Sequence, residues 1–379
     1  MRRCCVSQSW VLWTLTVAAV LMGSVARAGR AGDAGPKTLL PSWEPSATLK
    51  AGLGYKDNVG LSRTAPEASP FVHTAVEGML LRLPVDGTQV LLYLAAEDTR
   101  FWESSRLDHE DFAMTQLEVR RFWENDWQAA LGLEGMYFDQ LIDFSITDTN
   151  LAALPARGLS LTIRPGVRRE LSTDVWLSLE TPVSRQLYKD SVDDYWEGGP
   201  KLTLGRTYGR QSEVSLSYLF TQRGYNRAPG RDADGDTITN SVRRVSHHEV
   251  QIGWKHFWDT KRHWRSSTRV GYRHSAENVS GYFDYERYEL VHQLRLKTER
   301  WEISAEGRVA HYRFPVQTVS DTDPEKRRRT DLRANLRAER QLNPHLRLYA
   351  QYEYERSDSN QLLDEYAVNT LSAGVSVEF

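Results

Sequence analysis

The chain has 379 residues, with 48 lysines and arginines, 50 aspartates and glutamates, and a formal net charge of −2 at pH 7. No basic excess marks it as a nucleic-acid-binding protein. Its two cysteines, Cys4 and Cys5, both lie in the first 28 residues, so the rest of the chain offers no disulfide and no thiol chemistry.

Residues 1–28 have the features of a secretory signal peptide. Arg2 and Arg3 precede an apolar core, and the alanines of Ala26–Ala28 form a small-residue cleavage site. An uncleaved anchor helix is the alternative, but the core is short for a membrane span. Cleavage would remove three arginines and no acid, which leaves 45 basic and 50 acidic residues and a net charge of −5. No later apolar run is long enough to predict a transmembrane helix.

Alternating apolar and polar residues, rather than helical periodicity, fill the rest of the chain. The segment "SEVSLSYLF" places Val214, Leu216, Tyr218 and Phe220 on one face, which is typical of a strand. We expect about sixteen such strands, beginning near residues 46, 71, 88, 111, 127, 157, 174, 194, 212, 245, 264, 284, 301, 329, 346 and 366. Pro182 interrupts the segment that begins at 174.

The connections alternate in length. Those after the even strands are short, as in 124–126 and 298–300, whereas those after the odd strands are longer and polar, as in 225–243 and 315–327. This is the pattern of an outer-membrane barrel, whose short turns face the periplasm. A propeller or β-helix would show a fixed repeat instead.

We therefore predict an all-β fold, a transmembrane antiparallel β-barrel of about 16 strands (14–18). Residues 1–28 would be the signal peptide, 29–45 a short periplasmic segment and 46–379 the barrel. The barrel pattern places the protein in the outer membrane, in contact with its lipid, and the even strand count places both termini on the short-turn, periplasmic side.

Several tryptophans lie beside the short turns. Such residues form an aromatic girdle at a membrane interface, whereas a β-sandwich core, the alternative, would not confine them to one rim. The residues are Trp123, Trp127, Trp258, Trp264 and Trp301.

The chain ends in an alternating strand and a final aromatic residue. Val375, Val377 and Phe379 resemble the recognition signal of the outer-membrane barrel assembly machinery. The resemblance implies that this machinery is a partner.

The first strand carries a second resemblance. Gly54, Tyr55, Asp57, Asn58 and Val59 stand where barrels of the putative porin-2 kind have G-Y-x-D-N-V before the first external loop. Related barrels are outer-membrane conduits for secreted exopolysaccharide, which implies periplasmic export components as further partners. A similar barrel ends the surface lipoprotein assembly modifiers, behind a large helical-repeat domain. Here only about 17 residues, 29–45, separate the predicted cleavage site from the first strand, which argues against that role.

The faces opposite the apolar ones are rich in charge, which a watery lumen accommodates and lipid does not. These inward charged residues would either set the ion selectivity of a pore or stabilise the barrel wall by salt bridges. Arg265, Arg269 and Arg273 are our candidate for an anion-attracting strip. The inward set is Lys50, Glu118, Arg120, Glu134, Arg164, Arg168, Lys201, Glu249, Lys255, Arg265, Arg269, Arg273, Arg287, Glu289, Arg295, Glu302, Glu306, Arg308, Arg333, Arg337, Glu339, Glu353 and Glu355.

Two loop motifs can be interpreted either as binding sites or as ordinary solvated segments. Asp232, Asp234 and Asp236 have calcium-ligand spacing but lack the later Glu of an EF-hand, which favours a solvated acidic loop. The basic run at 326–329 would touch lipopolysaccharide phosphates or an acidic polymer, or simply be a solvated strand end.

No catalytic motif stands out, and no cofactor is expected. His247 and His248 are adjacent, so a strand points them to opposite faces. The leading hypothesis is a channel for hydrophilic cargo, either small solutes or a secreted exopolysaccharide. The alternatives are a surface lipoprotein assembly factor and a barrel enzyme.

Overall fold

The computed structural model describes residues 43–84, 86–144, 153–189, 192–209, 211–320 and 323–379. The predicted signal peptide and nearly all of segment 29–45 lie outside these residues. The strands are β1 Trp43–Lys56, β2 Ser69–Arg82, β3 Thr88–Phe101, β4 His109–Phe122, β5 Trp127–Asp143, β6 Ala153–Glu170, β7 Val175–Glu180, β8 Val183–Tyr188, β9 Tyr195–Gly198, β10 Lys201–Tyr208, β11 Ser212–Tyr225, β12 Arg244–Phe257, β13 Trp264–Glu277, β14 Tyr285–Lys297, β15 Trp301–Ser320, β16 Asp323–Gln341, β17 Leu346–Ser359 and β18 Tyr366–Glu378.

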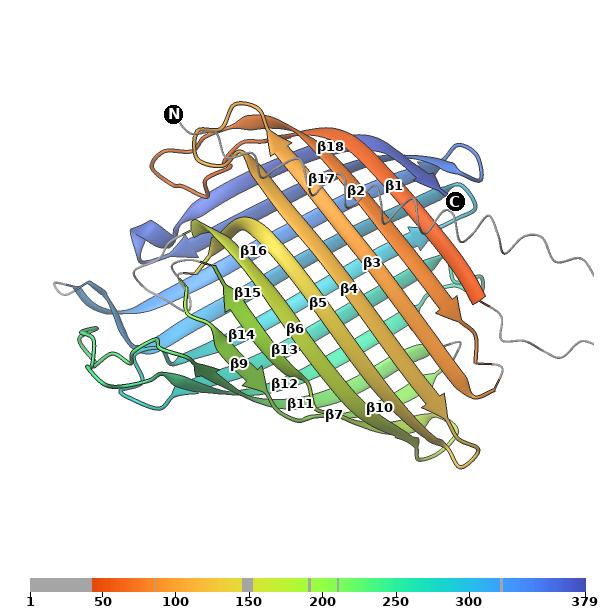
Figure 1. The fold of residues 1–379 in the computed structure, drawn as a ribbon, viewed down its shortest axis with the longest axis horizontal. Coiled ribbons are helices and arrows are strands. Elements are labelled where there is room, and N and C mark those ends of the chain that lie inside the picture. The colour runs from red at the N-terminus through yellow and green to blue at the C-terminus, as the bar shows by residue number, and fades with distance from the viewer. Residues whose placement is uncertain (1–42, 85, 145–152, 190–191, 210, 321–322) are drawn as a thin grey trace, which may run out of the picture.

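These strands form one closed antiparallel sheet (Figure 1), because β1 pairs with both β2 and β18. In the described residues there are eighteen strand elements, but β7 with β8 and β9 with β10 are halves of two broken strands. Sixteen strands therefore close the barrel, as the sequence predicts. One short 3-10 helix, η1 (Leu362–Asp364), is the only helical element in the described residues.

The two breaks lie side by side, and prolines explain them. Pro182 separates β7 from β8, and Pro200 separates β9 from β10. Neither proline has an N–H to donate to the ladder. The Gly199 amide instead donates to the Pro182 carbonyl oxygen at 3.1 Å, so the neighbouring strands are interrupted at the same level.

Most predicted strand starts agree with the structure within about two residues. The prediction of the seventh long connection was wrong. Residues 315–327 were expected to be a loop, yet β15 continues to Ser320 and β16 begins at Asp323, with register shifts after Arg313. The polar sequence suggests solvent exposure, but Gln317 and Arg327 are buried and bonded to each other, Nη1 to Oε1 at 2.8 Å. The hairpin thus satisfies its own polar groups.

The outer face of the barrel is apolar. Successive cross-strand partners form one row from β10 to β16, and its members are exposed (Leu216 by 51%, Ile252 by 53%). This row consists of Leu204, Leu216, Ile252, Val270, Leu290, Val309 and Leu332. A continuous exposed apolar band on a closed sheet is what a lipid bilayer requires.

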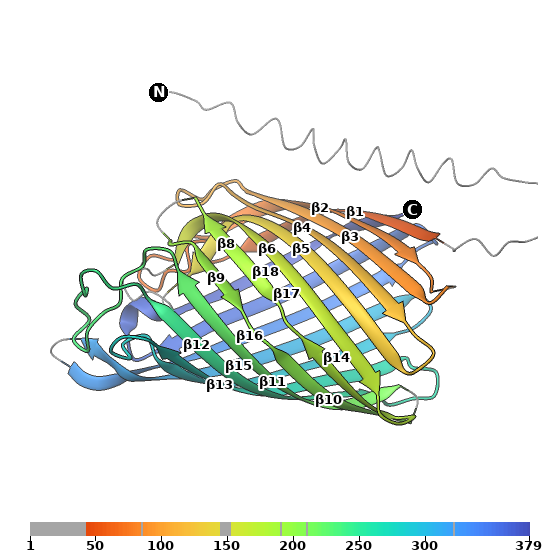
Figure 2. The same cartoon turned by 60° about the horizontal axis from the view of Figure 1, so that its bottom comes forward.

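The five predicted girdle tryptophans are also exposed, and all lie at the ends of strands beside short turns. The short turns gather at one end of the barrel and the longer connections at the other, as Figures 1 and 2 show. We call these the short-turn end and the long-loop end. In the described residues no helix is long and apolar enough to cross a membrane.

The seam between β1 and β18 contains the residues of both sequence motifs. Phe379 and Ala47 exchange backbone hydrogen bonds, and the Phe379 ring is 53% exposed on the outer face. At the other end of the seam, the Asp57 carboxylate accepts bonds from the Asn369 amide at 2.8 Å and its side-chain Nδ2 at 2.7 Å. The Asn58 Nδ2 donates to the Ala367 carbonyl oxygen at 3.1 Å. The motif therefore ties the β1–β2 connection to β18.

Candidate functional site in the lumen

Every charged residue predicted to face inward lies on the strand face opposite the exposed apolar residues. Along β13, for example, Val270 and Tyr272 are exposed outside, so Arg269 and Arg273 point inward. His247 and His248 likewise point to opposite sides. His247 is buried near the inward ring of Tyr285, and His248 contacts the outward ring of Tyr218.

Two residues of the predicted arginine strip belong to a larger cluster built on Glu249 and Glu289. The Arg273 Nε bonds the Glu249 carboxylate at 2.5 Å, and the Arg287 Nη2 lies 3.4 Å from the same oxygen. The cluster of four arginines and two nearly buried glutamates has an excess of two positive charges. The pairs to Glu289 are Arg308 at 2.6 Å, Arg287 at 3.8 Å and Arg269 at 4.0 Å.

The third residue of the strip, Arg265, lies directly opposite Arg295 on β14. Its Nη2 donates to the Gln293 Oε1 at 3.1 Å, whereas Arg295 pairs with Glu302. This group also has a positive excess. The inner wall from β12 to β14 is therefore cationic overall, although most of its arginines have partners.

Several other predicted lumen residues form balanced ion pairs. Arg333 bonds Glu355 at 2.8 Å and Arg337 bonds Glu339 at 2.7 Å on the wall of β16 and β17. Arg120 pairs with Glu118 on β4, and the Glu306 Oε2 accepts a bond from Gln293 at 3.2 Å. These pairs fit a stabilised wall, the alternative that the sequence left open.

A contact that the sequence did not predict crosses the lumen. The Arg329 Nη2 on β16 lies 2.6 Å from the Asp143 Oδ2 at the end of β5, and its Nε bonds Asp331 at 2.6 Å. β5 and β16 are not neighbours, because β17, β18 and β1 to β4 lie between them on the shorter way around. The end of β5 therefore reaches across the barrel.

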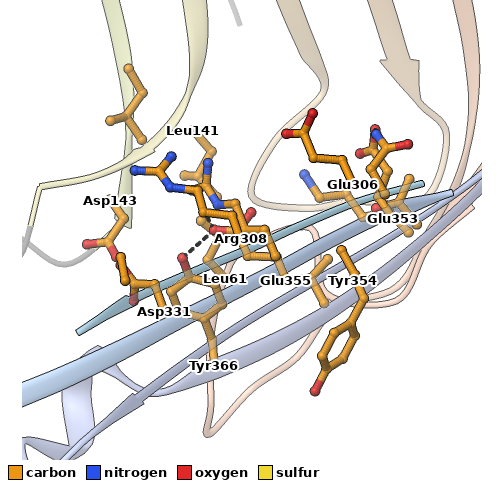
Figure 3. Close-up of a pocket in the computed structure, with 18 of the residues that line it drawn as sticks. Leu61, Leu141, Asp143, Glu306, Arg308, Asp331, Glu353, Tyr354, Glu355 and Tyr366 are labelled. Carbon is orange, nitrogen blue, oxygen red and sulfur yellow. Dashed lines mark hydrogen bonds and ion pairs between the residues drawn. The ribbon is translucent and has the colours of Figure 1, made fainter. Parts of the chain in front are cut away.

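This contact borders a cavity of about 590 Å³ at the long-loop end (Figure 3). Lys56, Arg308, Arg333 and Tyr366 line it from the wall, and Leu141 lines it from β5. Figure 3 shows Asp143 on the side of the cavity facing Asp331 and Arg308. The arrangement narrows the lumen and surrounds the remaining space with charge.

A second cavity of about 480 Å³ lies beside the first and is lined by aromatic rings. We call Tyr188, Tyr195 and Tyr225 the tyrosine row. Their ring centroids are 6.4 Å and 5.4 Å apart along the row, and Phe144 contacts Tyr188 at 5.9 Å. The Arg223 guanidinium stacks 4.3 Å from the Tyr195 ring. Alternation alone did not single out this row, because its members come from three strands.

The basic run at 326–329 is only half solvated. Arg327 and Arg329 are buried, while Lys326 and Arg328 are exposed on the outer face. The Arg327 Nε bonds the Asp364 Oδ2 of η1 at 3.0 Å. Burial raises the pKa of the Asp364 carboxyl, and the Arg327 guanidinium opposes that rise.

The acidic loop shows no metal centre. The Asp232 Oδ1 accepts bonds from the amides of Asp234 at 3.1 Å and Asp236 at 2.9 Å, which closes a turn. Within the described ranges, no group of three or more His, Cys, Asp or Glu residues is placed to hold a metal ion.

The fold and lumen together define a transmembrane β-barrel with an apolar exterior and a charged interior, the architecture of outer-membrane proteins. No protein-family model matches the sequence, and no curated protein sequence matches it. Solved structures with a similar overall shape include three bacterial proteins. The anion-selective porin from Comamonas acidovorans is 10% identical over 90% of this chain and 100% of that chain, with a TM-score of 0.43. OccAB1 from Acinetobacter baumannii is 7% identical over 89% and 97%, with a TM-score of 0.47, and OccAB4 is 9% identical over 90% and 100%, with a TM-score of 0.46.

Proposed function

We propose that the protein is an outer-membrane channel through which small hydrophilic solutes diffuse, with a preference for anions. The observation that carries this proposal is the lumen. Its cationic wall from β12 to β14 faces a space that the Asp143–Arg329 contact narrows. A barrel of sixteen strands is wide enough for an aqueous passage, and charged inner rows keep that passage wet.

The narrowing favours small solutes over large ones. A segment that reaches across the lumen and is held there by a buried ion pair leaves a cavity rather than an open bore. The arginine excess favours anions, because fixed charges in a confined space raise the local concentration of counter-ions.

Single-channel conductance of the refolded protein in a planar bilayer tests the proposal. Stable current steps with anion selectivity are expected. Well-folded protein that gives no steps under any applied voltage would contradict an open channel.

The second candidate is the conduit of an exopolysaccharide secretion system, and the tyrosine row favours it. Aromatic rings beside polar groups suit the amphipathic faces of sugars. The Arg223 guanidinium and the row line one cavity at the long-loop end. A conduit would open only with periplasmic export components. Conductance that appears only when such components are added would favour this candidate.

We further propose that the long-loop end faces the outside and that both termini are periplasmic, as the loop lengths indicate. Barrel assembly machinery would recognise Val375, Val377 and Phe379. Protease cleavage of intact cells at an inserted site in loop 226–243 tests the orientation. Nothing in the described residues favours the lipoprotein assembly factor or the barrel enzyme.

A further inference from the structure

The outer face of β12 to β16 carries a second row beyond the apolar one. Its members are successive cross-strand partners, and on each strand the row lies four residues from the apolar row, toward the long-loop end. We call it the outer charged row: His248, His274, Glu286, Arg313 and Arg328.

The depth of this row follows from the strands. Trp258 and His248 are ten residues apart on or beside β12, as are Trp264 and His274 on β13. Ten residues span roughly 33 Å along a strand, or about 25 Å across a bilayer at the usual tilt. That height equals the apolar band of outer-membrane barrels. With tryptophans at one interface, the outer charged row lies at the other, where lipid head groups begin.

Two arginines of the row face each other. Arg313 on β15 is the direct cross-strand partner of Arg328 on β16, and both are exposed. Like charges directly opposite on neighbouring strands destabilise a sheet. An anion bound between them would remove this cost.

Nearby carboxylates compensate the pair only in part. The Arg328 Nη2 lies 3.0 Å from Glu325. Glu286, the cross-strand neighbour of Arg313, instead accepts bonds from the hydroxyls of Tyr272 and Tyr288, each at 3.3 Å. The Arg313 guanidinium lies 5.7 Å from the Tyr288 ring. Within the part of the chain that the structure describes, Arg313 has no ion-pair partner.

A groove of about 680 Å³ accompanies the arginines, with His274, His311, Arg313 and Arg328 among its lining residues. Lys326 also lines the groove, but its Nζ donates a hydrogen bond to the Val316 carbonyl oxygen at 2.8 Å. The groove thus combines volume, exposure and two guanidinium groups at head-group depth.

The opposite side of the barrel provides a contrast. At the long-loop ends of β3 to β6, the outward arginines are satisfied by aspartates. Arg100 bonds Asp98 at 2.6 Å, and the Arg157 Nε bonds Asp139 at 2.6 Å, with Asp111 adding a further negative charge. By contrast, among the described residues Arg313 on β15 lacks an ion pair, and its neighbour Arg328 has only Glu325.

We propose that Arg313 and Arg328 form a binding site for a phosphate group on the head group of a bilayer lipid. Arginine pairs bind phosphate through forked hydrogen bonds, and the site opens toward lipid rather than toward the lumen. This site is independent of whether the barrel conducts. It gives Arg328 of the basic run a role that the channel does not use.

Native mass spectrometry of the folded, detergent-solubilised chain with diphosphorylated lipid A tests the proposal. The variant R313Q/R328Q is expected to bind roughly a hundredfold more weakly, about tenfold for each charge-assisted contact. The matched control R100Q/R356Q removes two outward arginines that are paired with Asp98 and Asp358, and should bind like wild type. Heat-modifiable gel mobility verifies folding. If R313Q/R328Q does not fold, R313K/R328K keeps the charge, loses the fork and should bind at an intermediate level.

Three results would overturn the site: equal binding by the arginine variant, equal loss in the control, or equal binding of dephosphorylated lipid A. Displacement of the lipid by sodium phosphate alone would assign the site to soluble phosphate and would also reject a lipid ligand.

Discussion

Asp143 and Arg329, which lie 186 positions apart in the sequence, form an ion pair across the lumen at 2.6 Å. Arg329 is 3% exposed and also holds Asp331 on its own strand. One arginine thus links the end of β5 to the opposite wall. The contact narrows the long-loop end of the lumen.

Replacing Asp143 with asparagine should therefore enlarge the passage. The variant D143N loses the charge that holds β5 against Arg329, so larger single-channel current steps are expected, with a loss of about 1–3 kcal/mol in the free energy of unfolding. The charge-swapped variant D143R/R329D should partly restore the wild-type current steps and stability.

The matched control for this prediction is D139N. Asp139 lies on the same strand, but its partner Arg157 is on the outer face. D139N should leave the current steps unchanged. Folded D143N with wild-type current steps would show that the ion pair does not limit the passage.

The arginine excess on β13 and β14 should set ion selectivity. R265Q/R295Q removes two inward positive charges, so the ratio of anion to cation permeability should fall, by roughly tenfold at low salt. The effect should shrink as salt screens the remaining charges. Reversal potentials in a salt gradient measure it. R333Q/E355Q removes a balanced pair and should not shift the reversal potential. A shift in this control would show that selectivity does not follow the net charge of the lumen.

Alternation predicted the strands well because its period of two is a local property. It also gave the direction of Arg269 and Arg273. It could not show that they share Glu249 and Glu289 with other arginines, because those pairings depend on strand register. Two of the three arginines in the predicted anion-attracting strip therefore lie in a partly compensated cluster.

Contacts across the lumen are harder to predict than contacts along the sheet. The Asp143–Arg329 pair joins strands that are not neighbours, so neither alternation nor turn length constrains it. The misassigned loop at 315–327 has a related cause. Its polar residues look solvated, but Arg327 finds Gln317 and Asp364 inside the folded chain.

The tyrosine row should bind saccharides if sugars pass through the barrel. Y195A removes the central ring, so block of the current by neutral oligosaccharides should weaken by roughly three- to tenfold. Y218A is the control, because Tyr218 is exposed on the outer face of β11 and does not line the lumen. Equal block in wild type and Y195A would remove the support that the row gives to a polysaccharide conduit.

A substitution of Phe379 should affect assembly of the barrel in cells without affecting its stability. The Phe379 ring is exposed to lipid, while its backbone amide donates to the Ala47 carbonyl oxygen at 2.9 Å, a bond that any residue can make. F379A should therefore reduce the amount of folded barrel in cells but leave the conductance and stability of refolded protein close to wild type. L371A, which removes another exposed side chain from the outer face of the same strand, controls for lost lipid contact. Equal cellular losses in the two variants would mean that Phe379 acts through the bilayer rather than through recognition by the assembly machinery.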